Sequence, residues 1–157
     1  MAISNLQQKQ RIIRLFALLF STYGVGFFIM AFLQTPPQME WYHTLSHSPL
    51  TPPPLTFSIV WTTLYALIAT SAMIVWEKTG HFTFLLQLLL QILWSYTFFV
   101  AHALWWAFGV LVLLCVVICL MGLNYTKHSK LAGLLLLPYF IWCLFASYLN
   151  LISAILN

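Results

Sequence analysis

The sequence predicts an all-α integral membrane protein: a bundle of five transmembrane helices with a proline-rich loop capping one end. Three observations lead to this class. The mean hydropathy is +0.95, and only 5% of the residues are charged, whereas soluble domains carry about 25%. The 157 residues suffice for five spans of about 20 residues each. All six Lys and Arg residues fall on one side of such a five-helix arrangement.

One domain, residues 1–157, is expected. The polar residues 1–10 are expected to form a disordered or interfacial lead. The apolar run that follows is too long for the hydrophobic region of a signal peptide and ends without a small-residue cleavage site. Thr35-Pro36-Pro37 ends this first span, because proline breaks a helix. The segments defined in this way are helices over about 12–33, 55–76, 82–101, 104–124 and 131–156, and a cap loop over 34–54.

The cap loop is rich in proline and aromatic residues. Four prolines from Pro49 to Pro54 exclude a continuous helix, although a short helix over 40–45 is compatible with the sequence. The stretch from Trp41 to Trp61 also contains a tyrosine and two histidines. Long loops with such side chains are often lids or binding loops, so this segment is interpreted as a cap over one end of the bundle.

Two predicted spans carry polar seams at helical spacing. In the third span the seam is Gln87, Gln91, Trp94, Phe98 and His102. Two glutamines inside a membrane need partners within the bundle, because lipid offers none. The fourth span is almost wholly aliphatic and is expected to be the most lipid-exposed helix. The fifth span contains Pro138, which predicts a kink, and its seam consists of Tyr139, Trp142, Ala146, Asn150, Ser153 and Asn157.

The positive charges predict an orientation. Basic residues precede the first span and follow the second and fourth spans, and none lies in the opposite loops. The positive-inside rule then places the N-terminus in the cytoplasm and the C-terminus outside. The same rule puts the cap on the non-cytoplasmic side of what is expected to be a bacterial cell membrane.

Several classes of chemistry find no support in the sequence. The only carboxylates, Glu40 and Glu77, fall in loops on opposite sides, so no acid–base pair is available. The three cysteines lie in apolar segments without further metal ligands nearby. His43 and His47 could hold a haem or a metal, but two interfacial polar residues are the more ordinary interpretation. We therefore expect no catalytic residue, no metal site, no covalently bound cofactor and no nucleic-acid partner.

The deeper tryptophans leave two interpretations open. Trp94 and Trp142 lie on polar seams, and an indole N–H in an apolar interior requires a partner. An ordinary helix–helix contact would supply one. Alternatively, Trp94, Trp142, Gln91 and Tyr65 line a mostly apolar pocket beneath the cap, which would suit a flat, hydrophobic, aromatic ligand.

The order and spacing of several motifs resemble the TspO/MBR family (tryptophan-rich sensory protein, translocator protein, peripheral benzodiazepine receptor). The resemblance covers almost the whole chain from the first span to Asn157. It implies a five-helix membrane bundle, usually a homodimer, that binds porphyrins, haem-pathway intermediates, sterols and benzodiazepine-type ligands. The motifs are Trp41-Tyr42, Ser48 to Pro53, Val60-Trp61-Thr62 with Tyr65, Trp94-Ser95 with Phe98-Phe99, and Pro138-Tyr139 with Trp142, Phe145-Ala146 and Leu149-Asn150.

The resemblance also implies site residues. Family binding positions correspond to Tyr42, Leu50, Pro53, Gln91, Trp94, Trp142 and Ala146. Together with residues of the pocket and seams, the expected ligand-binding set is Tyr42, Leu50, Pro53, Tyr65, Gln91, Trp94, Phe98, Trp142, Ala146 and Asn150.

Four departures from the family pattern limit what the resemblance implies. Leu50 stands where a tryptophan linked to light-dependent porphyrin breakdown is often found, and Gln91 stands where asparagine is common. No basic residue follows Lys130, so the sterol-recognition pattern of animal members is not supported. Ser95 is the only obvious small residue on the third span for a dimer contact.

The hypothesis is a membrane receptor or carrier that binds porphyrin or other tetrapyrrole intermediates, with a sensory, regulatory or transport role. Sterol or benzodiazepine-type ligands, the lipid bilayer and a second copy of the chain are the other expected partners. The alternatives are a light-dependent porphyrin-degrading enzyme and an accessory membrane subunit without a ligand of its own.

Overall fold

The computed structural model describes the backbone of residues 2–157 and the side chains from Gln7 onward. Within this range it contains helices and no strands, and five of the helices are long and apolar enough to cross a membrane. The predicted all-α membrane bundle is therefore confirmed. The elements are α1 (Ala2–Phe28) with the π-helical segment η1 (Ile29–Leu33), α2 (Pro36–Thr44), α3 (Pro54–Val75), α4 (Phe82–Ser95) with the π-helical segment η2 (Tyr96–Val100), α5 (Leu104–His128) and α6 (Lys130–Leu156).

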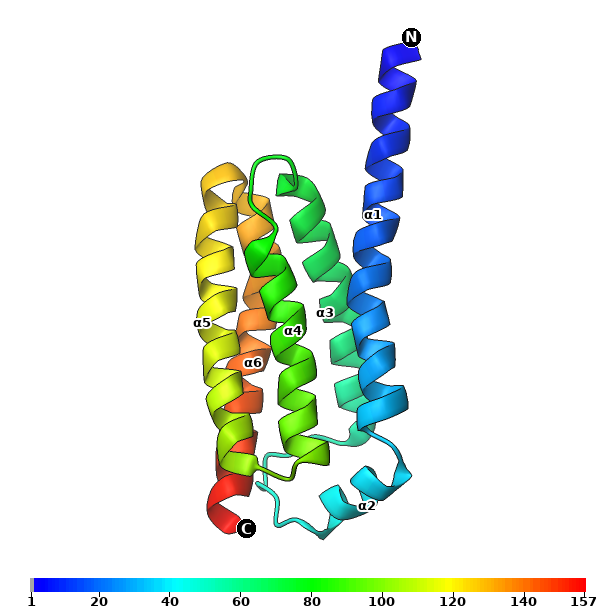
Figure 1. The fold of residues 1–157 in the computed structure, drawn as a ribbon. Coiled ribbons are helices and arrows are strands. Elements are labelled where there is room, and N and C mark those ends of the chain that lie inside the picture. The colour runs from blue at the N-terminus through cyan, green and yellow to red at the C-terminus, as the bar shows by residue number, and fades with distance from the viewer. Residues whose placement is uncertain (1) are drawn as a thin grey trace.

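The five long helices run side by side and alternate in direction (Figure 1). The N-terminus and the C-terminus lie at opposite ends of the molecule, and the short helix α2 lies at the C-terminal end. The α3–α4 and α5–α6 connections both lie at the other end, towards the N-terminus. This alternation places every Lys and Arg residue at the end that lacks the cap.

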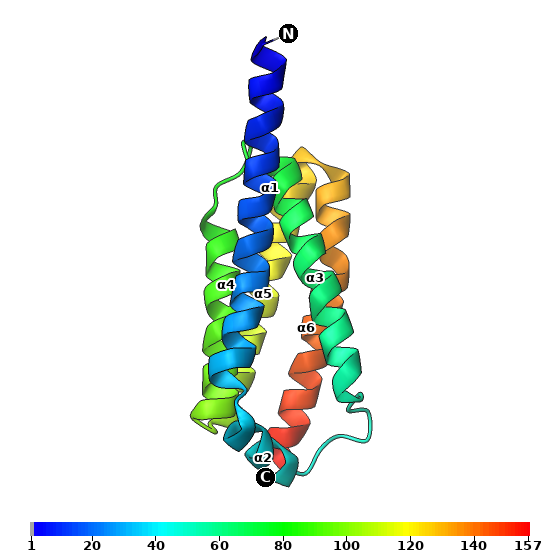
Figure 2. The ribbon, with the colours of Figure 1, turned by 90° about the vertical axis from the view of Figure 1, so that its right-hand side faces the viewer.

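Three bounds differ from the predicted ones by more than one residue. Helix α1 begins at Ala2 rather than near residue 12, so residues 2–10 of the expected lead are helical; the Gln, Lys and Leu residues among them have good helix propensity. Figure 2 shows this first part of α1 projecting beyond the bundle. Helix α5 continues to His128, past the predicted end at residue 124. The cap contains α2, which begins at Pro36, where the fixed φ of proline suits a first helical turn.

Helix α5 is not the most lipid-exposed helix, so that expectation is wrong. It packs most extensively against α6 and also lies against α4. Of the most apolar stretch of α5, 39% is buried, compared with 22% for α1. The large side chains that α5 contributes to the core are Leu111, Leu114, Ile118, Met121 and Tyr125.

Close helix contacts depend on small and hydroxyl residues, as is common in membrane proteins. Ser71 of α3 is fully buried and donates a hydrogen bond of 2.7 Å to the carbonyl of Ala132 in α6. Gly133 faces Thr126 across the α5–α6 contact without space for a side chain. Ser129 caps α6 by accepting a hydrogen bond from the backbone N–H of Ala132. These contacts fix α3, α5 and α6 as the frame on which the candidate site is built.

Candidate functional site: the cap, the interior polar cluster and the groove beside Trp142

Helix α2 docks onto the end of the bundle through aromatic side chains. The ring of Tyr42 lies about 6 Å from the rings of Phe98 and Phe99, which are buried in and beside η2. Trp41 stacks on His102 with ring centroids 3.8 Å apart and planes 9° from parallel. Burial raises the pKa of Tyr42 above its ordinary value, so its hydroxyl stays protonated. The cap is thus a packed lid rather than a loose connection.

The far end of the cap is held by Asn157. The Asn157 Oδ1 atom accepts a hydrogen bond of 2.9 Å from the N–H of Ser46, and its Nδ2 donates one of 3.1 Å to the carbonyl of Ser46. Within the cap, His47 Nε2 lies 3.0 Å from the Tyr42 carbonyl oxygen. Contacts at Trp41, Tyr42 and Ser46 therefore keep the segment 36–47 closed over the bundle.

Replacing Asn157 by alanine should loosen the cap without unfolding the bundle. Loss of the two exposed hydrogen bonds to Ser46 is expected to cost about 1 kcal/mol, so local opening of the cap should rise about fivefold. Hydrogen exchange of a peptide covering residues 45–53, followed by mass spectrometry, would measure this. Asn124→Ala is the matched control, because Asn124 lies near the end of α5 that is away from the cap. Equal exchange in wild type and Asn157→Ala would show that Asn157 does not hold the cap.

The two glutamines of α4 form a buried polar cluster with Tyr139 of α6. Gln91 Nε2 donates to Gln87 Oε1 at 2.7 Å and to Tyr139 Oη at 2.8 Å, while Tyr139 Oη donates to Gln87 Oε1 at 2.9 Å. All three residues are at most 1% exposed. The predicted need for partners inside the bundle is thus met mainly by Tyr139. Within the described side chains, Gln87 Nε2 and Gln91 Oε1 have no hydrogen-bond partner.

Trp94 belongs to a second buried link, one turn nearer the cap. Its indole Nε1 donates to Asn150 Oδ1 at 3.2 Å, and Asn150 Nδ2 donates to the carbonyl of Leu104 at 2.9 Å. Asn150 is 3% exposed. One side chain of α6 therefore joins α4 to the first turn of α5. Of the two interpretations that the sequence left open for Trp94, an ordinary helix–helix contact describes the hydrogen bond observed.

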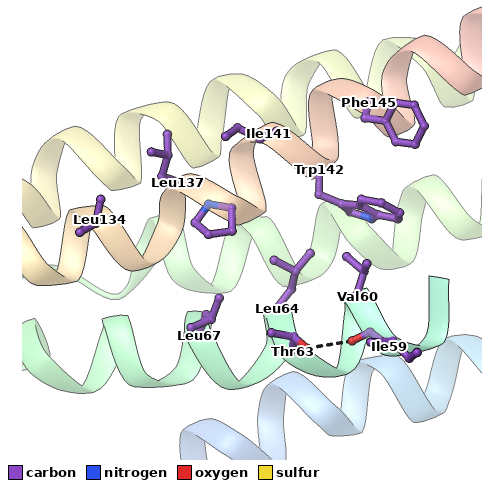
Figure 3. A pocket seen from close by; sticks show the side chains of 11 residues that line it. Ile59, Val60, Thr63, Leu64, Leu67, Leu134, Leu137, Ile141, Trp142 and Phe145 are labelled. Atoms are coloured by element: carbon purple, nitrogen blue, oxygen red, sulfur yellow. Dashed lines mark hydrogen bonds between the residues drawn. The ribbon is translucent and has the colours of Figure 1, made fainter. Parts of the chain in front are cut away.

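Trp142 lies elsewhere, in the wall of a groove between α3 and α6 (Figure 3). The groove has a volume of about 770 Å³ and is lined almost wholly by apolar side chains. Its only side-chain hydroxyl, that of Thr63, already donates to the carbonyl of Ile59 at 2.9 Å. The Trp142 ring meets Phe57 edge to face, with centroids 5.6 Å apart. Its indole nitrogen is buried and has no partner among the described residues.

The structure divides the ten predicted site residues among several places. Tyr42 and Phe98 meet at the cap, and Trp94 pairs with Asn150. Gln91 lies in the interior cluster, and Tyr65 packs between Trp61 and Tyr23 of α1. Trp142 alone lines the groove, while Ala146, one turn further along α6, is buried. Pro53 directly precedes α3, and Leu50 is 62% exposed in the cap loop.

Sequence reasoning missed the opposite wall of the groove. This wall is formed by aliphatic residues of α3, and aliphatic residues in a membrane helix give no signal that separates a ligand-facing surface from a lipid-facing one. Phe57, which contacts the Trp142 ring, is different, because an aromatic residue three positions after a proline run could have been added to the predicted pocket. The α3 residues concerned are Ile59, Val60, Leu64 and Leu67.

Comparison with known proteins agrees with these features. The model of the TspO/MBR family matches residues 17–155. The chain is 37% identical over 143 residues to the tryptophan-rich protein TspO of Chlorobaculum tepidum, covering 85% of this chain and 89% of that protein. It is 31% identical to the translocator protein of Homo sapiens (71% and 72% covered) and 30% identical to the tryptophan-rich sensory protein of Cereibacter sphaeroides (75% and 77% covered). This chain therefore belongs to the TspO/MBR family.

Proposed function

We propose that this protein binds a porphyrin or a related flat tetrapyrrole in the groove between α3 and α6, as part of a sensory or transport role in the membrane. A volume of about 770 Å³ falls within the range of small-molecule sites, roughly 300–1,000 Å³. The apolar lining suits a hydrophobic macrocycle. The names of the relatives, tryptophan-rich sensory protein and translocator protein, support the sensory or transport part of the proposal.

The observation that carries the proposal is the unpartnered N–H of Trp142. A buried indole N–H without an acceptor costs free energy, and a ligand acceptor would remove that cost once it displaced the side chains that cover the nitrogen. Carboxylate side arms and ring nitrogens of a tetrapyrrole are such acceptors. Phe57 holds the indole edge to face, which fixes the direction in which the N–H points. The aromatic wall is thus preorganised for a flat ligand.

The outer rim of the groove suggests entry from the bilayer. Ile59 is 59% exposed, Ile141 57% and Leu134 62%, and these side chains border the groove. In a membrane such surfaces face lipid tails, in which a hydrophobic macrocycle dissolves. A ligand could therefore reach Trp142 laterally while the cap remains closed.

The proposal includes an orientation and an assembly. With all basic residues at the end opposite the cap, the positive-inside rule favours a cytoplasmic N-terminus and an external C-terminus, in a bacterial cell membrane. A homodimer is the expected assembly from family resemblance. The cap and the end of the groove nearer to α2 would then face the outside.

Fluorescence quenching by protoporphyrin IX tests the proposal. Titration of the purified protein should give saturable quenching, and Trp142→Phe should weaken binding about three- to tenfold, the loss of one buried hydrogen bond. Phenylalanine keeps an aromatic ring but lacks the N–H donor and the second ring of the indole. Trp106→Phe is the control, because Trp106 is 77% exposed at the start of α5, and its affinity should equal that of wild type.

Two results would contradict the proposal. Linear quenching, or the same affinity in Trp142→Phe and wild type, would mean that porphyrin partitions into the detergent or binds outside the groove. Illumination of the complex distinguishes binding from porphyrin breakdown. Catalytic turnover in light would favour the enzyme alternative despite the leucine at position 50.

A further inference from the structure

A second hollow lies at the end of the bundle opposite the cap. It has a volume of about 300 Å³ and lies between the N-terminal half of α1 and the end of α3. Its lining combines charged and apolar side chains. These are Arg11, Arg14, Met73, Ile74, Glu77 and Lys78.

The charged side of this hollow is strongly basic. Arg11 and Arg14 are three residues apart on α1, so they share one face of the helix. Lys78 adds a third cation from the turn after α3. With Glu77 as the one carboxylate, the hollow carries a net charge of two positive. These three cations are half of the six Lys and Arg residues in the chain.

Glu77 orients the arginine without neutralising the site. Arg14 Nη1 donates to Glu77 Oε1 at 2.6 Å, and the Arg14 side chain is only 25% exposed. The hydrogen bond and charge of Arg14 lower the pKa of Glu77, so this carboxylate is ionised at neutral pH and the contact persists. A guanidinium has five N–H donors, and one contact leaves the remaining donors available for a second anion.

The apolar side of the hollow points to the chemistry of its occupant. Met73 and Ile74 belong to the last turn of α3, and Ile74 is 38% exposed. They lie next to the cations, where the apolar run of α3 ends and that of α1 begins. A molecule that fills the hollow therefore meets three cations at one end and hydrocarbon at the other. Free inorganic phosphate would use only the first of these.

We propose that this hollow binds the phosphate group of an anionic phospholipid, with the part of an acyl chain nearest to the headgroup against Met73 and Ile74. Arginine is well suited to phosphate because its planar fork can donate two parallel hydrogen bonds. Basic pockets between membrane helices at headgroup level suit anionic lipids. No residue lines both this hollow and the groove beside Trp142, so the site is independent of the proposed tetrapyrrole groove. A bound lipid would join α1, which is the least buried span, to α3.

Native mass spectrometry with phosphatidylglycerol tests this site. Purified full-length protein in neutral detergent would be titrated with the lipid, and the first binding constant would be measured. Arg11→Gln combined with Lys78→Gln should weaken the first binding event about tenfold relative to wild type. The matched control is Lys127→Gln combined with Lys130→Gln, which removes the same charge at the same end of the molecule but outside the hollow. The control should weaken binding less than about threefold.

Further experiments distinguish the phosphate of a phospholipid from free inorganic phosphate. Phosphatidylcholine should bind more weakly than phosphatidylglycerol, and millimolar inorganic phosphate should not displace the bound lipid. Arg11→Lys combined with Lys78→Arg keeps the charges and should retain binding. Arg11 and Lys78 are exposed, so the double glutamine variant is expected to fold, which its melting curve would check. Equal losses in the two glutamine variants, or displacement by inorganic phosphate, would overturn the proposal.

Discussion

Asn150→Leu is expected to lower the free energy of unfolding by about 2 kcal/mol. The loss arises because two polar groups lose their hydrogen-bond partner, and not because a cavity forms. Leucine has as many side-chain heavy atoms as asparagine, so the substitution leaves no cavity. The indole N–H of Trp94 and the carbonyl of Leu104 both lose their bond to Asn150. A buried orphan costs about 1–3 kcal/mol in soluble proteins, while hydrogen bonds between membrane helices average about 0.6 kcal/mol. Two unpaired polar groups, each at a cost between these two figures, together give the expected loss of about 2 kcal/mol.

Reversible unfolding in mixed micelles, with sodium dodecyl sulfate as denaturant, would measure this change. Asn124→Leu is the matched control, because Asn124 makes no side-chain hydrogen bond in the described part of the chain and lies on α5 away from this link. The fluorescence of Trp94 adds a local readout, since its indole loses a polar neighbour and its emission should shift to shorter wavelength. If both leucine variants unfold alike, the Trp94–Asn150–Leu104 link contributes no stability.

The five spans could be predicted because the bilayer imposes a length and an apolar composition on each of them. The interior position of the glutamines could be predicted for a related reason: an amide in hydrocarbon needs a partner from another helix. Gln87 and Gln91 do find one, in Tyr139. Both arguments depend on the solvent around the protein and need no knowledge of how the helices are arranged.

The arrangement itself could not be predicted from composition. In a membrane, the buried and lipid-facing sides of a helix are both apolar, so the aliphatic sequence of α5 gives no sign of its extensive packing against α6. Small residues were the better indicator. Ala107 in α5 and Ala132 in α6 are both fully buried, and small residues let helix backbones approach closely.

The predicted pocket assumed that all residues of the α6 seam point in the same direction. At about 100° per residue, Tyr139 and Asn150 point within about 20° of each other, and both contact α4. Trp142 is about 60° away from Tyr139 on the same helical wheel. This rotation turns its indole towards α3. The three- and four-residue spacing that defined the seam therefore joins residues that serve two different contacts.

Gly133→Leu should destabilise the bundle most, by about 3 kcal/mol, because α5 and α6 meet there without room for a side chain. A Cβ atom at Gly133 would overlap the hydroxyl of Thr126, and it would lie 3.0 Å from the Thr126 Cβ and 3.3 Å from the carbonyl oxygen of Gly122. A hydroxyl can rotate, but the backbone carbonyl of α5 cannot move without shifting the helix. Overpacking costs about 1–3 kcal/mol, and contact with backbone places this substitution at the upper end.

Gly109→Leu on α5 is the control, and its expected effect has the opposite sign. Nothing lies within 4 Å of a Cβ built at Gly109, so only the gain in helix propensity, somewhat under about 1 kcal/mol, acts there. Thermal and detergent unfolding of both variants would separate the effect of steric overlap at the helix contact from the effect of helix propensity. A second test uses alanine: Gly133→Ala should be destabilised, and adding Thr126→Gly should restore most of the loss, since it removes both Thr126 atoms that the new Cβ meets. Additive effects in the double variant would show that Thr126 is not the obstacle, and the close α5–α6 contact would then not depend on this pair.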